Sequence, residues 1–575
     1  MATASTKPGN RAANQPAQPT DGSDVSRRTW VIASVVILAL AALLRFYNLD
    51  LVPLHHDEGV NGNFLVRLVR EGFYRYDPAN YHGPTLYYFA AIYPRILRAV
   101  FGVQAQNNYG LTTTAIRAVP ALFGLGTIAL VLTLRRNLGS IATLFAAALL
   151  AISPGAVYLS RYFIHETLFV FFTLSLVVTG LRYFEEARPL YLILASISAA
   201  LLFATKETAI ISVGVLALAL LFTRIYRMVL EQSGNVAPTK KKRRGRSKEQ
   251  SGFVAGAGGR GVVITWLIVA VAIFIAVNVI LYSSFFTNFP KGVWDALRTF
   301  QFWSKTGKEA HVHPYTTYLW WLLLQESPLL VLGAIGAMFA LVKPGKSFVL
   351  FCALWGFGLI AAYSLIAYKT PWLCLSLIVP LALMAGHTFE WLYQELFEWE
   401  VGRRLRLATL GIVFVIATGV LPGVVRAQTQ KKFHAKTFIP GYQTIDLNFI
   451  NYDNDDRYYV YVYAHTRRET LKLVAEINRI AQRTHQASET GITIVSPDYW
   501  PLPWYLRDYS RVGYFGRMVS SNEPIIIASQ AQAEEVRTTF GDRYQLVHSG
   551  FNTAGSFPLR PGVDLLLYTR RELVR

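Results

Sequence analysis

Two histidines and two carboxylates stand side by side in the segment PLHHDEGVNGN, residues 53–63. Imidazole and carboxylate groups in such a cluster act as general bases or coordinate divalent metal ions. The cluster His55–Glu58 follows an apolar run, so we expect it where a chain that leaves a bilayer meets water. A base, a metal site and ordinary solvated loop residues are the interpretations that the segment leaves open. Gly59 and Gly62 would let the backbone approach a ligand closely.

Membrane helices are the elements that must position this cluster. Of the 575 residues, 53% are hydrophobic and 14% are aromatic, and the mean hydropathy is +0.32. Because a soluble domain cannot bury so much apolar surface, the composition predicts a polytopic α-helical membrane protein. Windows of about twenty apolar residues predict about eleven transmembrane helices. They lie near residues 30–46, 111–134, 139–159, 164–184, 189–205, 208–226, 262–286, 316–342, 346–366, 372–393 and 404–424.

Basic residues predict the orientation of these helices. The formal net charge is +21, and the densest basic run, Lys240–Lys248, lies between two predicted spans. Lysine and arginine in loops favour the cytoplasmic side, so the run indicates topology and we expect no nucleic acid as a partner. The prediction is a multi-pass protein of the cytoplasmic membrane, in contact with membrane lipid. Its parts are a disordered cytoplasmic N-terminus (1–29), a transmembrane domain (30–425), a basic cytoplasmic loop (227–261) and external loops at 47–110 and 287–315.

Beyond residue 426 the long apolar runs give way to short ones. Strands are predicted for YYVYVYA (Tyr458–Ala464), GITIVS, PIIIAS, YQLVHSG and DLLLYTR, and a helix for 467–484. This alternation predicts an extracytoplasmic α/β domain at 426–575. In the first external loop, Pro84–Gly102 has the periodicity of a helix that lies in the membrane interface. A further short helix is expected at VNGNFLVRLVREG, from Val60 onward.

Further short motifs are expected on the same side of the membrane as the His55–Glu58 cluster. They are YHGPTLYY (Tyr81–Tyr88), SRYFIHET (Ser160–Thr167), ATKET (Ala204–Thr208), YKTPWL (Tyr368–Leu373) and DYWPLPWYLRDY (Asp498–Tyr509). Their order resembles the GT-C superfamily of polyprenyl-phosphate-sugar-dependent glycosyltransferases, which includes protein O-mannosyltransferases and aminoarabinose transferases. The pattern is most similar to a prokaryotic family of flippase-activity-associated membrane proteins of the GT-C type. The resemblance spans nearly the whole chain.

The resemblance implies an inverting glycosyltransferase that moves a sugar from a polyprenyl-phosphate donor to an extracytoplasmic acceptor, which is a glycan, a lipid or a protein. Such a reaction needs a base for the acceptor hydroxyl and positive charge for the leaving phosphate. The implied base is Asp57, with Glu58 orienting either Asp57 or the acceptor. Glu166 matches the second acidic position of the superfamily; an ion pair with Arg161 is the alternative for this residue.

The implied substrate-binding residues are cations, histidines and one aromatic side chain at the external ends of the spans. They are His56, His82, Arg161, Lys206, Lys369 and Trp372, with Arg95 and Arg98 as interfacial candidates. Arginine grips phosphate through two hydrogen bonds, whereas lysine acts as a point charge. At the position of His82 the aminoarabinose transferases can carry a lysine, so contact with phosphate, with the acceptor or with nothing stays open for this residue.

No cofactor is required by this reading, but a divalent metal ion is an open alternative. Its ligands would be drawn from His55, Asp57, His311 and His313, because these are ligand types for such ions. The aromatic residues of DYWPLPWYLRDY could stack on an acceptor sugar or pack against the membrane portion.

Two functions other than an enzyme are alternatives for this sequence. A non-catalytic accessory protein that binds a lipid-linked sugar and assists its flipping or handover would need nearly the same cations. A secondary transporter is disfavoured because few ionisable residues occur in mid-span and no matching pair of broken helices is evident in the sequence.

Overall fold

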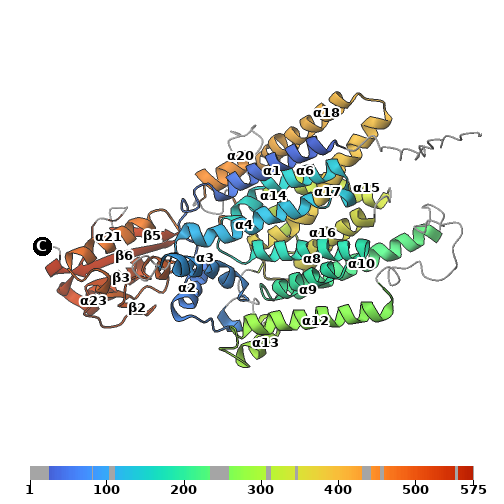
Figure 1. Ribbon diagram of the computed structural model, residues 1–575. Coiled ribbons are helices and arrows are strands. Elements are labelled where there is room, and N and C mark those ends of the chain that lie inside the picture. The colour runs from blue at the N-terminus through green and yellow to red at the C-terminus, as the bar shows by residue number, and fades with distance from the viewer. Residues whose placement is uncertain are drawn as a thin grey trace, which may run out of the picture.

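The computed structural model describes residues 25–80, 82–102, 110–232, 258–305, 312–342, 347–429, 442–452, 459–548, 550 and 555–573. A bundle of long helices forms one part of the molecule, and a mixed β-sheet domain at the C-terminus forms the other (Figure 1). Helices α2 and α3 lie at the end of the bundle that carries the β-sheet domain (Figure 1). The assignment of that end to the outside of the cell stays a prediction.

Eight segments of the described chain are helices long and apolar enough to cross a membrane. They are α1 (Arg27–Phe46), α4 (Thr113–Leu132), α8 (Glu166–Glu186), α10 (Ala209–Gln232), α12 (Arg260–Tyr282), α16 (Ser347–Leu365), the unit Pro371–Glu398 formed by η3 (Pro371–Leu373) and α17 (Cys374–Glu398), and the unit Arg403–Val425. This last unit contains α18 (Arg403–Val415), the π-helical turn η4 (Ile416–Val420) and the start of α19 (Leu421–Thr429).

Two further spans are broken in the middle. Helices α6 (Ser140–Ile152) and α7 (Pro154–Ser160) meet at 60°, and α14 (Thr317–Gln325) and α15 (Ser327–Val342) meet at 112°, which raises the number of candidate spans in the described chain to 10. The one predicted span that remains, 189–205, corresponds to α9 (Pro189–Phe203), an apolar helix of 15 residues. At 1.5 Å per residue, α9 is shorter than the hydrocarbon core of about 30 Å. The polytopic helical fold is therefore confirmed, and the described residues contain eight to ten candidate spans where the sequence predicted about eleven.

Helix α17 is the central helix of the bundle. In its apolar window 83% of the residues are buried inside the protein, a larger share than in any other candidate span of the described chain. Helices in lipid gain little from hydrophobic burial against each other, so close backbone packing between small residues holds them together. Gly386 of α17 shows this contact, because a Cβ atom there would lie 2.1 Å from the carbonyl oxygen of Ala142 on α6.

The first of the external loops that the sequence predicted contains the expected helices. In the first loop lie α2 (His56–Glu71), the turn η1 (Pro78–Asn80) and α3 (Thr85–Phe101). The later loop contains α13 (Lys291–Lys305), a helix that the sequence analysis did not predict. Helix α2 begins at His56, not at Val60, because His55 caps its first turn. Asp57 and Glu58 are therefore residues of a helix start and not of an irregular loop.

The C-terminal domain is a six-stranded sheet with the order β2-β1-β3-β6-β4, in which β5 pairs with β6. Strands β2, β1 and β3 run parallel, and β6 runs antiparallel to β3, β4 and β5. Their bounds are β1 (Ile492–Ile494), β2 (Val512–Tyr514), β3 (Ile525–Ser529), β4 (Tyr544–Leu546), β5 (Ser556–Arg560) and β6 (Val563–Arg570). The helices of the domain are α21 (Thr470–Arg483), α22 (Leu502–Tyr505) and α23 (Ala533–Phe540). The remaining short elements are α5 (Arg135–Leu138), α20 (Tyr442–Ile445), η5 (Asp446–Ile450), η6 (Ala487–Glu489), η7 (Gln530–Gln532), η8 (Gly541–Arg543) and η9 (Arg571–Leu573).

One predicted strand of this domain is wrong. Residues 459–464 form turns and loop, and Tyr458 lies outside the described residues. Tyr459, Tyr461 and Val462 are each at most 2% exposed and belong to the core shared with the membrane helices. Their burial against that core, and not the two faces of a sheet, accounts for the run of aromatic and β-branched residues. The sequence analysis also missed β2 and β5, whereas α21, β1, β3, β4 and β6 are confirmed.

We expect Gly386→Ala to destabilise the protein by about 1–3 kcal/mol, because a methyl group at this crossing forces α17 and α6 apart. Thermal unfolding in detergent measures the effect. Gly411→Ala on α18 is the matched control, since nothing lies within 4 Å of the Cβ position there. An equal melting temperature for both variants would contradict the packing argument.

Candidate functional site

The start of α2 fixes the carboxylate cluster through reciprocal hydrogen bonds. The Nδ1 atom of His55 accepts from the backbone N–H of Asp57 at 3.1 Å, and Oε2 of Glu58 accepts from the backbone N–H of His55 at 3.0 Å. This is a capping box with histidine in place of serine or threonine. Both carboxylates lie in the first helical turn, where the helix dipole stabilises negative charge.

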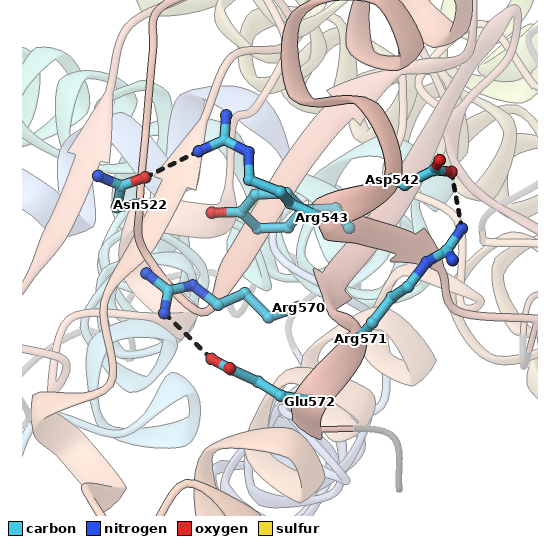
Figure 2. Close-up of a pocket in the computed structure, with 7 residues that line it drawn as sticks. Asn522, Asp542, Arg543, Arg570, Arg571 and Glu572 are labelled. Atoms are coloured by element: carbon cyan, nitrogen blue, oxygen red, sulfur yellow. Dashed lines mark hydrogen bonds and ion pairs between the residues drawn. The ribbon is translucent and has the colours of Figure 1, made fainter.

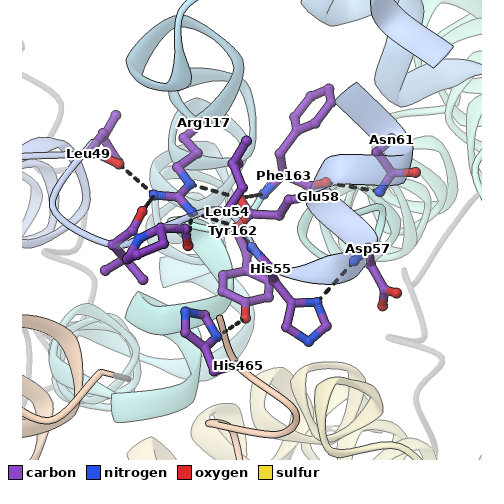
Figure 3. A network of polar contacts seen from close by, with 12 residues as sticks. Leu49, Leu54, His55, Asp57, Glu58, Asn61, Arg117, Tyr162, Phe163 and His465 are labelled. Atoms are coloured by element: carbon purple, nitrogen blue, oxygen red, sulfur yellow. Dashed lines mark hydrogen bonds and ion pairs between the residues drawn. The ribbon is translucent and has the colours of Figure 1, made fainter. Parts of the chain in front are cut away.

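Glu58 forms the buried ion pair of this region with Arg117 of α4. Oε1 of Glu58 accepts from Nε of Arg117 at 2.7 Å, and Oε2 accepts from Nη2 at 2.6 Å (Figure 3). Oε1 also accepts from the backbone N–H of Phe163 at 2.8 Å. The remaining guanidinium N–H groups donate to the carbonyls of Leu49, Val52 and Pro53. Glu58 and Arg117 are at most 1% exposed, so Glu58 positions α2 and does not itself meet a ligand.

Asp57 differs from its neighbour in being open. The residue is half-buried, and no hydrogen bond to its carboxylate comes from any residue that the structure describes. In Figure 3 this carboxylate points away from the ion pair of Glu58 and Arg117. A carboxylate that is fixed by its backbone and free at its oxygens can accept a proton from an incoming hydroxyl.

Tyr368 links Asp57 to a second charged group of the site. Burial raises the pKa of the Tyr368 phenol; the positive charge of Lys206 opposes this, and the negative charges of Asp57 and Glu166 add to it. The Tyr368 hydroxyl is thus within electrostatic range of Asp57, Glu166 and Lys206. The sequence analysis included Tyr368 in the motif YKTPWL but predicted no role for it.

Glu166 pairs with Lys206, and the alternative pairing with Arg161 is wrong. The Nζ atom of Lys206 lies 2.7 Å from Oε1 of Glu166, and both residues are at most 5% exposed. Burial opposes the charge of Lys206, but Glu166 and Glu207 raise its pKa above the ordinary value. Lys206 is therefore a charged lysine whose charge is already balanced.

Arg161 is engaged at the end of α1. Its guanidinium donates to the carbonyls of Tyr47 at 2.6 Å and Asn48 at 2.8 Å, and more weakly to those of Leu44 and Arg45. Basic groups commonly satisfy the last carbonyls of a helix in this way. The predicted phosphate contact would require Arg161 to leave these carbonyls.

The motifs YHGPTLYY and ATKET pair through their backbones. The N–H groups of Gly83 and Thr85 donate to the carbonyls of Thr205 at 3.1 Å and Ala204 at 3.3 Å. A Cβ atom on Gly83 would lie 2.1 Å from the carbonyl oxygen of Ala204, so only glycine allows this approach.

The backbone pairing places His82 beside Glu207. Nδ1 of His82 lies 3.0 Å from Oε2 of Glu207. Burial alone would raise the pKa of Glu207, but His82 and Lys206 lower it below its ordinary value. Sequence reasoning missed Glu207, although it directly follows Lys206 in ATKET.

Lys369 and Trp372 come from the same motif, but their side chains contact different parts of the protein. The ammonium of Lys369 is fully buried and donates to the carbonyls of Ser364, at 3.1 Å, and Ile366 near the end of α16. The ring of Trp372 is half-buried and lies 6.1 Å from the ring of His55. Trp372 therefore belongs to the Asp57 side of the site, whereas the charge of Lys369 is used within its own turn.

A metal ion bound through His55 does not fit this geometry. Nδ1 of His55 accepts from Asp57, and Nε2 contacts the carbonyl of Tyr463 at 3.0 Å, so neither ring nitrogen keeps a lone pair for a metal. The backbone N–H of His313 donates to the Ala367 carbonyl, and its ring packs against Trp321. His311 lies outside the described residues. Among the described residues, no group of three His, Cys, Asp or Glu side chains could hold a metal ion.

The glycines of α2 serve the C-terminal domain. A Cβ atom on Gly59 would lie 2.5 Å from Pro501, and one on Gly62 would lie 2.6 Å from the ring of Trp504, which is 1% exposed. The hydroxyl of Tyr505 accepts from the N–H of Leu54 at 2.9 Å. These glycines admit α22 and not the ligand that the sequence predicted, and Trp504 of DYWPLPWYLRDY packs against α2.

These features define a polytopic helical membrane protein with a GT-C-like fold. A family model described as dolichyl-phosphate-mannose-protein mannosyltransferase matches residues 95–237. ArnT from Cupriavidus metallidurans, in its apo state, superposes with a TM-score of 0.60 at 14% identity over 94% of this chain and 98% of that chain. The same protein bound to undecaprenyl phosphate gives a TM-score of 0.56 at 15% identity over the same shares.

The archaeal oligosaccharyltransferase AglB from Archaeoglobus fulgidus, in complex with an inhibitory peptide and a dolichol-phosphate, gives a TM-score of 0.49 at 13% identity over 88% of this chain and 70% of that chain. Comparison with curated proteins gives no match. At these identities the likeness to ArnT establishes the fold alone. The finer resemblance to the flippase-associated family stays a prediction.

We expect Glu58→Ala to cost about 3–5 kcal/mol of stability, because it leaves the buried guanidinium of Arg117 without its counter-charge. Thermal and chemical unfolding of the purified protein measure the loss. Glu71→Ala, at the exposed end of the same helix, is the matched control and should change stability by less than about 0.5 kcal/mol. A small effect at Glu58 would show that the pair does not hold α2 in place.

The half-buried His56 gives stability a pH dependence. Burial lowers the pKa of His56 to about 4 from the ordinary 6.5, with Asp57 acting in the opposite direction. Because the folded state then binds fewer protons than the unfolded state between these values, stability is full above about pH 6.5 and falls as the pH approaches 4. Relative to His56→Gln, the wild type should lose melting temperature between pH 7 and pH 4.5. The exposed His548→Gln is the control, and parallel curves for His56→Gln and wild type would contradict the assignment.

Proposed function

We propose that this protein is an inverting glycosyltransferase that moves a sugar from a polyprenyl-phosphate donor to an acceptor on the external side of the membrane. The observation that carries the proposal is the carboxylate of Asp57. It is held by its backbone in the first turn of α2 and accepts no hydrogen bond at its oxygens from a described residue. Its charge acts on the Tyr368 hydroxyl together with the charges of Lys206 and Glu166. A general base in such a transfer requires this combination of fixed position and open oxygens.

In the proposed reaction Asp57 takes the proton of the acceptor hydroxyl as its oxygen attacks the anomeric carbon. The bond from that carbon to the phosphate oxygen breaks on the opposite face, so the configuration inverts, and polyprenyl phosphate leaves with the bonding electron pair. Glu58 does not react; through Arg117 it keeps Asp57 at the attack position. Orientation of this kind supplies a large part of the rate.

The leaving phosphate needs hydrogen-bond donors, because the local charges are nearly balanced. Lys206 faces both Glu166 and Glu207, and His82 shares a hydrogen bond with Glu207. We assign the phosphate to this His82–Lys206 side of the site, with the hydroxyl of Tyr368 as a further donor. Preorganised donors of this kind stabilise developing negative charge even when they are neutral. The fold likeness to ArnT bound to undecaprenyl phosphate supports a polyprenyl phosphate as the donor class.

A second candidate function is the accessory role, in which the protein binds a lipid-linked sugar without turning it over. One observation favours it: three of the predicted phosphate-binding cations, Arg161, Lys206 and Lys369, are engaged within the protein. Arg161 and Lys369 donate to backbone carbonyls, and Lys206 pairs with Glu166. Such a site could hold a sugar-bearing lipid through polar contacts while lacking the positive field that drives phosphate departure.

We expect Asp57→Asn to lower glycosyl transfer at least about 100-fold, since a positioned base contributes 10²–10⁴-fold. The amide keeps the shape of the side chain and removes its basicity. Release of polyprenyl phosphate and labelling of the acceptor in proteoliposomes measure the rate. Asp50→Asn, an exposed residue of the same loop, is the matched control and should retain wild-type activity.

Undiminished transfer by a correctly inserted Asp57→Asn protein would remove Asp57 as the base. If the wild type binds the donor lipid but releases no polyprenyl phosphate with a broad panel of glycan, lipid and peptide acceptors, the accessory role replaces the enzyme.

A further inference from the structure

A cavity of about 550 Å³ lies away from Asp57, beside the C-terminal half of α2. Its walls are α2, residues 73–77 of the first external loop and residues 287–291 at the start of the later loop, and Arg67, Arg75 and Lys291 are among the residues that line it. Arg67 is ten residues after Asp57 on the same helix, which corresponds to about 15 Å. The cavity is thus a separate feature from the candidate site.

The two loops that form this cavity are fixed to each other. The backbone N–H of Tyr74 donates to the hydroxyl of Ser284 at 2.8 Å, and the ring of Tyr76 meets the ring of Tyr282 edge-on at 4.7 Å. Tyr282 is the last residue of the candidate span α12. The cavity is therefore anchored at the point where a membrane helix ends.

Two guanidinium groups of this cavity form no ion pair, although two acids also line it. Arg67 and Arg75 are exposed, and neither forms an ion pair with a residue that the structure describes; Arg75 lies over the ring of Phe73 at 5.0 Å. Of the acids that line the cavity, Asp77 accepts the N–H of Ala79, which leaves Glu71 as the open one. Exposed arginines without an ion pair keep their guanidinium N–H groups available for bidentate contact with phosphate.

A second cavity, at the edge of the C-terminal sheet, shows the opposite arrangement. There each arginine has a partner: Arg570 with Glu572 at 3.1 Å, Arg571 with Asp542 at 3.0 Å and Arg543 with Asn522 at 3.1 Å (Figure 2). In the α2 cavity, by contrast, neither Arg67 nor Arg75 forms an ion pair with a residue that the structure describes.

The segment that borders the α2 cavity carries an exposed aromatic surface. Phe285, Phe286 and Phe289 follow α12 directly and are 55%, 61% and 58% exposed, and Trp294 of α13 is 59% exposed. Aromatic side chains that are exposed at the end of a transmembrane helix insert at the level of the lipid headgroups. The two guanidinium groups then lie beside the surface at which phospholipid phosphates are found.

From these observations we propose that the α2 cavity is a binding site for the phosphate headgroup of an anionic membrane phospholipid. Arg67 and Arg75 contact the phosphate, and the acyl chains lie along Phe285, Phe286 and Phe289. The bound lipid would join the first external loop to the end of α12. This proposal is independent of the proposed sugar transfer and of the identity of the donor.

Native mass spectrometry of the full chain in detergent, titrated with phosphatidylglycerol or phosphatidylcholine, tests the site. We expect the wild type to prefer phosphatidylglycerol and the double variant Arg67→Gln/Arg75→Gln to bind it about tenfold more weakly, because two partly exposed charge contacts are lost. Arg571→Gln, which removes a paired arginine from the C-terminal cavity, is the matched control and should bind as the wild type does. Gel filtration confirms that each variant is folded.

Equal binding of phosphatidylglycerol by the wild type and the double variant overturns the proposal, as does a wild type with no preference between the two lipids. Inorganic phosphate provides the remaining arm of the experiment. If it displaces phosphatidylglycerol from the wild type at equal concentration, the ligand is free phosphate and the assignment to a lipid fails.

Discussion

The buried pair of Arg117 and Glu58 is the interaction on which the candidate site depends. An ion pair removed from water loses its hydration, and only complete hydrogen bonding in good geometry offsets that loss. Here the five guanidinium N–H groups have acceptors, supplied by Glu58 and by three carbonyls between Leu49 and Pro53. One side chain of α4 thereby holds the chain that leaves α1 and the first turn of α2. The direction of the Asp57 carboxylate follows from that fixation (Figure 3).

The sequence predicted the large elements because their signals are local. Apolar runs marked the spans, and the helix of α3 followed from its own periodicity. Partners could not be predicted in the same way. Arg117 lies 59 residues from Glu58, inside a segment that was read only as an apolar span. Glu166 had a near cation in Arg161, but its partner Lys206 is 40 residues away.

The start of α2 and the false strand show a different limit of sequence reasoning. A histidine cap replaces the hydroxyl side chain that normally marks a helix start, so the helix was placed four residues late. The alternation in YYVYVYA is typical of a strand, yet Tyr461 lies in the core of the bundle and its hydroxyl donates to Glu326 at 3.4 Å. Glu326 separates α14 from α15 and also accepts the N–H of Gly155 at 2.8 Å. The segment around Tyr461 is thus part of the core of the helix bundle, at the breaks between α6 and α7 and between α14 and α15.

The proposed phosphate side of the site has two parts. One is a rigid backbone frame, formed where Gly83 contacts Ala204, and the other is the side-chain pair of His82 and Glu207. The frame is main chain against main chain, and the 2.1 Å approach excludes every side chain larger than hydrogen at residue 83. His82 and Glu207, by contrast, touch only through their side chains. Positions 82 and 207 can therefore be changed together, as a complementary pair, to vary the chemistry of the proposed phosphate side while the backbone that presents them stays in place.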